Sequence, residues 1–197
     1  MSPRRARKAT LPEGELLAAV DIGSNSFHMV VGRSVLGQLR IVDRIKEHVR
    51  LAEGLDGRGG LSGEAQARAL DTLSRFGERL GSLPARQVRA IATNTVRQLR
   101  DPQSFLGPAE AALGHAIEVV SGREEARLIY QGVAHGNPPR SRHRLVMDIG
   151  GGSTEFIVGE GFEPLERESL QMGCIATTRR FFADGKLSRK RWKEAQT

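Results

Sequence analysis

Short apolar runs separated by turn-forming residues occupy the first part of the chain, and this pattern is typical of β-strands. We expect such strands at residues 16–22, 27–33 and 38–46. A glycine-rich loop follows at 53–63, and apolar residues then recur at helical spacing from Ser62 to Leu80. The pattern therefore predicts three linked strands, a loop and a long helix.

After that helix, single strands alternate with helices. We expect a strand at 88–92, a helix broken near Asp101-Pro102, a helix at 102–113, a strand at 117–120 and a helix from Ser121 to about 136. Beyond it the opening pattern restarts, with strands on either side of a second glycine hairpin, a strand at 163–171 and a helix from about 175. Hairpin-linked strands followed by helix–strand alternation indicate an α/β sheet of mixed direction. The restart indicates a duplicated domain.

The domain organisation follows from this restart. Residues 1–14 contain prolines, a glycine and four basic side chains, and we expect a flexible basic leader there. Turn formers and charges at 137–141 mark the best boundary, so 15–138 is the first domain and 139–197 the start of an incomplete second copy.

A short loop of glycine and hydroxyl residues occurs once in each copy. The first copy reads Asp21-Ile22-Gly23-Ser24-Asn25-Ser26, and the second reads Asp148-Ile149-Gly150-Gly151-Gly152-Ser153-Thr154. Glycines allow the backbone to approach an anion closely, and the Ser, Thr and Asn side chains add donors. Two such hairpins predict two half-sites that face each other across a cleft and hold an oligophosphate.

Composition limits the class of protein. The 197 residues are 39% hydrophobic, and no apolar run approaches the ~20 residues of a membrane span, so we expect a globular, cytoplasmic protein. Cys174 is the only cysteine, and we expect a small packed side chain rather than a nucleophile. The net charge of +7 favours a polyanionic partner. Aromatic residues make up only 5% of the chain, without stacking clusters, so no specific nucleic-acid partner is expected.

Glu125 is the candidate general base. Ser121 and Glu124 have the spacing of a capping box, in which Glu124 reaches back to the free amides at the helix start. Glu125 has no such task, and if this helix end faces the cleft it could deprotonate a water molecule, kept ionised by the helix dipole. The alternative is a solvent-exposed acid in the first turn of the helix.

Acidic residues beside the loops are candidate metal ligands. Asp21 and Asp148 are equivalent in the repeat, and Glu155 follows on the strand after the second loop. Hard cations such as Mg²⁺ prefer carboxylate oxygens, and the alternative for each acid is to stabilise a turn. Arg97 follows a buried strand and could bind phosphate in a forked geometry, or it could be a surface arginine. We expect His28 to be packed or structural.

Taken together, these motifs resemble the exopolyphosphatase/guanosine pentaphosphate phosphatase (Ppx/GppA) family, within the actin/sugar-kinase/Hsp70-like superfamily. The matching stretches are 19–27, 92–97, 121–128, 148–155 and Met172-Gly173-Cys174. The resemblance implies a duplicated actin-like (ribonuclease H-like) fold, here with a truncated second copy, and an active site in the cleft between the copies. It also implies Mg²⁺-dependent release of orthophosphate from the end of inorganic polyphosphate.

The resemblance also assigns roles to residues. Glu125 matches the catalytic glutamate, and Asp148 and Glu155 match acids near the metal. The matching phosphate-binding residues are Gly23, Ser24, Asn25, Arg97, Gly150, Gly151, Gly152 and Ser153. A homodimer is expected for the longer family members, and peripheral association with a membrane stays open.

Three other functions remain open. Hydrolysis of the 5′-phosphate of guanosine pentaphosphate (pppGpp) would use the same loops. A non-catalytic phosphate-binding piece is the second, since family members normally continue beyond residue 197. An ATP-dependent kinase is the third and fits less well, because Glu125 suits activation of water better than transfer to an alcohol.

Overall fold

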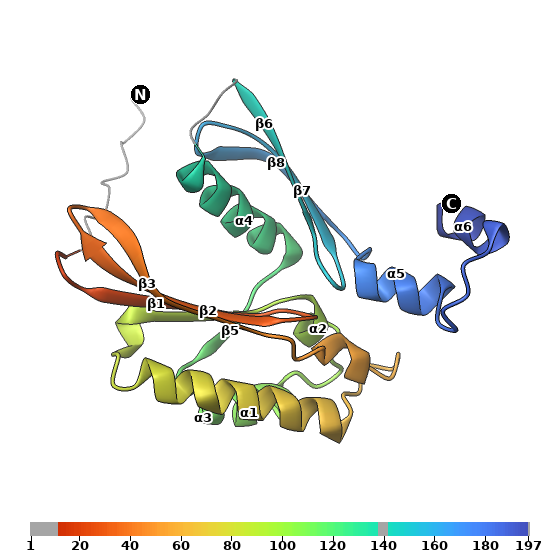
Figure 1. The fold of residues 1–197 in the computed structure, drawn as a ribbon, viewed down its shortest axis with the longest axis horizontal. Coiled ribbons are helices and arrows are strands. Elements are labelled where there is room, and N and C mark those ends of the chain that lie inside the picture. The colour runs from red at the N-terminus through yellow and green to blue at the C-terminus, as the bar shows by residue number, and fades with distance from the viewer. Residues whose placement is uncertain (1–11, 138–141, 197) are drawn as a thin grey trace.

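The structure, a computed structural model, describes residues 12–137 and 142–196. The structure contains two β-sheets, and helix α4 (Gly122–Gly136) lies between them (Figure 1). None of the helices in these residues is long and apolar enough to cross a membrane. Residues 1–11 of the expected leader and most of the expected boundary, 138–141, lie outside the described residues, so the division into domains stays a prediction.

The first sheet has five strands in the order β3-β2-β1-β4-β5. They are β1 (Leu16–Ile22), β2 (Phe27–Val35), β3 (Gln38–Glu47), β4 (Val88–Ala92) and β5 (Ile117–Val119). The first three pair antiparallel, whereas β4 lies parallel to β1 and β5 parallel to β4. The α/β sheet of mixed direction predicted from the sequence is therefore confirmed.

Two helices, α1 (Gly63–Leu80) and α3 (Gln103–Leu113), cover one face of this sheet (Figure 1). Alternate residues of β1 and β2 point into a core with these helices, and Phe27, Met29, Leu73 and Phe76 are almost completely buried there. The other face of the sheet lies on the side of helix α4 and the second sheet (Figure 1). This division follows from the period of two in a strand, which sends successive side chains to opposite faces.

One helix prediction needs correction, and two short 3₁₀ turns were not predicted. The helix after β4 was expected to run to a break near Asp101-Pro102, but α2 is a single turn, Asn94–Arg97. The long loop before α1 contains a 3₁₀ turn at Leu51–Gly54, and another 3₁₀ turn, Ala85–Gln87, precedes β4.

The second sheet has three antiparallel strands in the order β6-β7-β8. These are β6 (His143–Ile149), β7 (Thr154–Glu160) and β8 (Glu163–Leu170), followed by α5 (Cys174–Phe181) and α6 (Arg189–Gln196). Helix α4 packs on this sheet and forms a second core with it, which contains Ala126, Tyr130, Ala134, Val146 and Ile157. Although α4 precedes the expected boundary in sequence, its buried face therefore belongs to the second sheet.

Replacing Gly159 with alanine is expected to lower the free energy of unfolding by about 1–3 kcal/mol. A Cβ at this position would lie 2.3 Å from the Tyr130 ring and 2.5 Å from the Glu163 carbonyl oxygen, and backbone cannot move aside cheaply. Gly132→Ala in α4 is the matched control, since nothing lies within 4 Å and alanine favours a helix. Urea unfolding measures both, and equal stability of the two variants would contradict this packing.

Candidate active site

The two hairpin tips are built in the same way. Strand pairing ends at Ile22–Phe27 in the first hairpin and at Ile149–Thr154 in the second, so each loop has the same length. In each loop the first glycine donates its N–H to the carbonyl of the last serine, at 3.2 Å from Gly23 and 2.9 Å from Gly150. The second hairpin therefore repeats the first at a constant offset of 127 positions, from Asp21 to Asp148.

The structure brings the two loops together. A Cβ on Gly151 would lie 3.3 Å from the Cβ of Ser24, and one on Gly152 would lie 3.0 Å from Ser24 Oγ and 2.7 Å from Asn94 Oδ1. A side chain at position 152 would therefore displace Asn94 or Ser24 from the contact between the loops. A cavity of about 330 Å³ opens beside this contact, and its lining includes Asp21, residues 23–26, His28, Lys46, Glu125, Asp148 and residues 150–153.

Strand pairing places one row of side chains from each sheet toward the cleft. In the first sheet Asp21 pairs with His28, which pairs with Lys46. In the second sheet the corresponding row is Asp148, Glu155 and Ser169. Each row begins with an equivalent aspartate. The first row continues with the basic residues His28 and Lys46, whereas the second continues with the acidic Glu155 and the neutral Ser169.

Glu125 enters this site from the first turn of α4. Ser121 caps the helix by accepting the N–H of Glu124 at 3.2 Å. The expected capping box is wrong in its second half, because the Glu124 carboxylate pairs with Arg127 at 2.7 Å instead of reaching back. Glu125 lines the cavity with a side chain that is only 15% exposed.

The pKa of Glu125 is raised to about 7. Burial is the largest cause, the hydrogen bond from Arg97 opposes it, and the charges of Glu155 and Asp21 raise it further. The helix dipole was expected to keep this carboxylate ionised, but desolvation and the neighbouring acids outweigh it. A carboxylate with a pKa near neutrality is suited to accept a proton.

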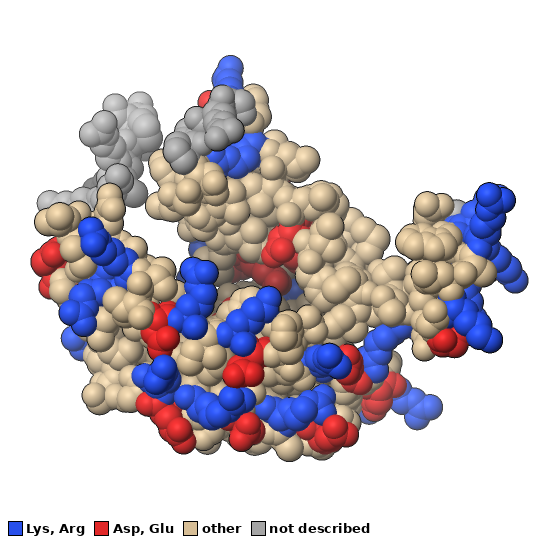
Figure 2. All heavy atoms as spheres, in the orientation of Figure 1, with Lys and Arg blue, Asp and Glu red and all other residues tan. Residues whose placement is uncertain are grey.

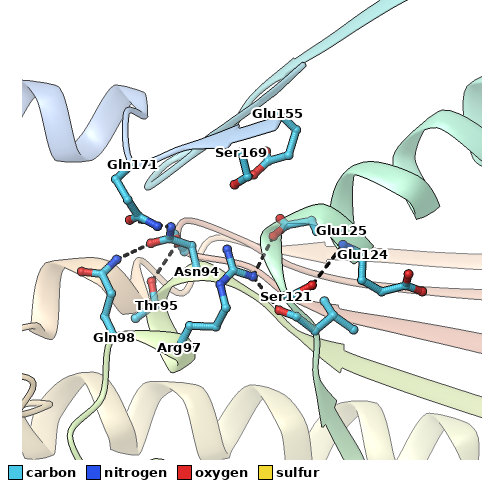
Figure 3. Close-up of polar contacts among 12 residues, drawn as sticks. Asn94, Thr95, Arg97, Gln98, Ser121, Glu124, Glu125, Glu155, Ser169 and Gln171 are labelled. Carbon is cyan, nitrogen blue, oxygen red and sulfur yellow. Dashed lines mark hydrogen bonds and ion pairs between the residues drawn. The ribbon is translucent and has the colours of Figure 1, made fainter. Parts of the chain in front are cut away.

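Arg97 contacts Glu125 rather than the cavity. Its Nη1 donates to Glu125 Oε2 at 2.9 Å and to the Val120 carbonyl at 2.7 Å (Figure 3). Its Nη2 is buried and has no hydrogen-bond partner among the described residues. The guanidinium therefore orients Glu125 and keeps one unused donor.

The acids next to the loops occupy two depths. Asp21 and Asp148 both line the cavity, and burial followed by the charge of Asp148 raises the pKa of Asp21 to about 6. Glu155 lies deeper, 1% exposed, where its Oε1 accepts a hydrogen bond from Ser169 at 2.8 Å (Figure 3). Across residues 12–137 and 142–196, no three His, Cys, Asp or Glu side chains are grouped closely enough to hold a metal ion by themselves.

Several supporting residues were not found by sequence reasoning. Thr95 Oγ1 donates to Ser24 Oγ at 2.8 Å, and Asn94 Nδ2 donates to Gln171 Oε1 at 3.0 Å, which links the two sheets. Strand alternation could have indicated Lys46, because it faces the same side as His28. Ser169 and Gln171 depend on how β8 pairs with β7, which no local pattern specifies.

Cys174 differs from its expected environment. The cysteine is exposed at the first residue of α5, where its N–H donates to the Gly150 carbonyl at 2.9 Å. Its side chain also lines the cavity, so it is not a packed core residue.

Comparison with known proteins identifies the family of this chain. Residues 30–197 match the model of the Ppx/GppA phosphatase family. The guanosine-5′-triphosphate,3′-diphosphate pyrophosphatase of Vibrio vulnificus (strain YJ016) is 49% identical over 180 residues, which are 91% of this chain and 36% of that protein. The protein of the same name from Aliivibrio fischeri (strain MJ11) is 46% identical over 189 residues, which are 96% of this chain and 37% of that protein. The chain thus spans little more than a third of the length of these relatives.

Solved structures extend the likeness to the fold. A crystal structure of an exopolyphosphatase from Cytophaga hutchinsonii is 32% identical, with a TM-score of 0.80 over 85% of this chain and 54% of that chain. The Aquifex aeolicus PPX-GPPA enzyme is 27% identical, with a TM-score of 0.75 over 91% of this chain and 60% of that chain. The actin-like α/β fold that the sequence resemblance implied is confirmed. The chain belongs to the Ppx/GppA phosphatase family.

Proposed function

We propose that this protein hydrolyses the terminal phosphoanhydride bond of a phosphate chain, with Glu125 as the base that takes a proton from the attacking water. The single observation that carries the proposal is the position of Glu125. It is a carboxylate with a pKa near neutrality in the wall of the cavity that both loops line. A general base in this position favours attack by water over transfer to an alcohol.

The loops supply the binding of the phosphate chain. Backbone N–H groups and the hydroxyls of Ser24 and Ser153 surround the cavity and would stabilise negative charge on the transferred phosphoryl group. Arg97 holds the Glu125 carboxylate in place, and its unused Nη2 is a further donor for a phosphate oxygen that enters the site.

The donors fit a magnesium ion. Asp148 and Asp21 lie beside each other in the cavity wall, and their mutual repulsion would be relieved by a divalent cation. Mg²⁺ commonly uses one or two carboxylates together with water and substrate phosphates, so a larger protein cage is not required. Glu155 was expected to share the metal. Because it lies deeper in the site, we propose that it adds negative charge behind Asp148 without binding the metal directly. Bound Mg²⁺ would neutralise developing charge on the phosphate oxygens.

Two substrates fit this proposal. Inorganic polyphosphate is the one expected from the sequence, and the solved exopolyphosphatase from C. hutchinsonii supports it. The relatives named for guanosine-5′-triphosphate,3′-diphosphate give the nucleotide at least equal support, at 46–49% identity.

Phosphate release from each substrate by the natural protein, with Mg²⁺ and with a chelator, tests the function. We expect Mg²⁺-dependent release of orthophosphate, and the ratio of kcat/KM values identifies the preferred substrate. Binding of both phosphate chains without any release would instead support the non-catalytic alternative.

Activity is expected to rise with pH through about 7. The pKa of Glu125 is raised from 4.5, so the carboxylate is protonated below this range and becomes a base only as the pH increases. A pH profile of kcat/KM on either substrate measures this acidic limb. A profile that is already flat from pH 5 upward would contradict the environment assigned to Glu125.

A further inference from the structure

Strand β3 separates its charges between its two faces. Asp43 and Glu47 face α1 and form ion pairs with Arg79 and Arg75, at 3.0 and 3.1 Å. Arg44 and Lys46 alternate with these acids and therefore point to the cleft side of the sheet. Both are exposed, and neither side-chain cation has a carboxylate within 4.0 Å in the described part of the chain, where the Asp43 carboxylate contacts Arg44 only at its backbone N–H.

Other basic groups surround these two cations. The pKa of His28, which pairs with Lys46 across the sheet, is lowered by burial and then by the charges of Lys46, His48 and Arg44. His28 Nε2 is buried without a hydrogen-bond partner among residues 12–137 and 142–196. His48 Nδ1 lies 3.0 Å from the hydroxyl of Ser26 in the first loop. His28 and Lys46 thus line the cavity, Arg44 and His48 lie close to His28, and the acid of this row is Asp21, which pairs with His28.

The row ends at an acid, Asp21, and the cavity wall also contains Asp148 and Glu125 from the second hairpin and α4. Figure 2 shows acidic atoms within the hollow between the two sheets and basic side chains on its edge, over β2 and β3. A phosphate chain bound in this field has a preferred direction. Its reacting end fits the acidic side, where a cation and a base are needed, and its remaining charge fits the basic side.

We infer that Lys46 and Arg44 form a subsite for the phosphates that follow the terminal one, so that the chain leaves the cavity across the cleft face of β3. Lys46 lines the cavity, whereas Arg44 lies two residues further along the strand, about 7 Å away. Lys46 therefore reaches the nearest following phosphates, and Arg44 meets only a longer chain. The inference rests on the proposed function, and it identifies the ligand as a condensed phosphate that extends beyond the cavity.

Binding of fluorescently labelled long-chain polyphosphate and competition by tripolyphosphate test this subsite. The measurements use the natural protein carrying Glu125→Gln, over a series of NaCl concentrations, with Lys46→Gln, Arg44→Gln or Arg40→Gln added. Arg40 is the matched control, because it is an exposed arginine of the same strand that lies opposite Arg33 and away from the cavity.

Lys46→Gln is expected to raise the dissociation constants of both ligands about tenfold. Arg44→Gln is expected to do so for the long chain alone. Each substitution should also reduce the slope of the logarithm of the long-chain binding constant against the logarithm of the salt concentration by about one. Arg40→Gln should match the parent protein. Equal binding by all three variants overturns the subsite, and so does an equal effect of Arg44→Gln on both ligands. A failure of the proposed function would appear separately, as absence of phosphate release by the wild-type protein.

Discussion

Replacing Glu125 with glutamine is expected to lower the rate of the proposed phosphate release by about 10²–10⁴-fold, the usual contribution of a general base. Glutamine keeps the size and one hydrogen-bond acceptor of the side chain but cannot take a proton from water. Because Arg97 Nη1 can still donate to the amide oxygen at this position, the site geometry should be retained. The measurement is kcat for the natural protein on polyphosphate and on pppGpp, with substrate binding measured in parallel.

Glu124→Gln is the control for this result. Glu124 is the neighbouring residue in the same helical turn, but its carboxylate pairs with Arg127 and does not line the cavity. Loss of this ion pair should leave kcat within about twofold, since pairs of this kind contribute little free energy. If Glu125→Gln retained the full rate, another group would have to activate the water, and the proposed mechanism would fail.

Replacing Arg97 with glutamine is expected to reduce kcat by about 10²-fold, the second largest effect. The change removes the donor that orients Glu125 and the buried, unpartnered Nη2 that is proposed to bind a phosphate oxygen. It also removes an interaction that lowers the pKa of Glu125, so this pKa rises above about 7. The acidic limb of the pH profile should therefore move to higher pH in this variant.

The direction of that movement distinguishes the two roles of Arg97. A residue that only binds phosphate would change KM and leave the limb in place, whereas a residue that holds the base moves the limb. Arg127→Gln is the matched control, because Arg127 pairs with Glu124 one turn along the same helix and should leave the profile unchanged. A limb that stays in place in Arg97→Gln would contradict the role given to its contact with Glu125.

The fold could be predicted from the sequence wherever local pattern determines it. Short apolar runs bounded by turn-forming residues identified the strands of both sheets, and the spacing of Ala65, Ala69, Leu73 and Phe76 identified α1. The packing of α4 could not be predicted in this way. Its apolar face is compatible with either sheet, and the choice depends on long-range contacts of Tyr130 with β7 rather than on the helix itself.

The site shows the same limit. The loops and Glu125 could be recognised because glycines, hydroxyls and a first-turn acid form local motifs. The partner of Arg97 could not, since Glu125 lies 28 residues away and the contact depends on the junction between β5 and α4. Nor could the difference in burial between Asp148 and Glu155. The two residues pair on adjacent strands, but Asp148 lines the cavity whereas Glu155 is buried.

Helix α4 begins beside the first sheet but packs along the second, so Glu125 belongs to an element of the second core. Arg97 follows β4 of the first sheet, and its ion pair with Glu125 therefore joins the two halves of the described structure. The relative position of the two halves consequently sets the distance between the carboxylate and the guanidinium that orients it. The arrangement of the halves and the chemistry of the site are coupled through this contact.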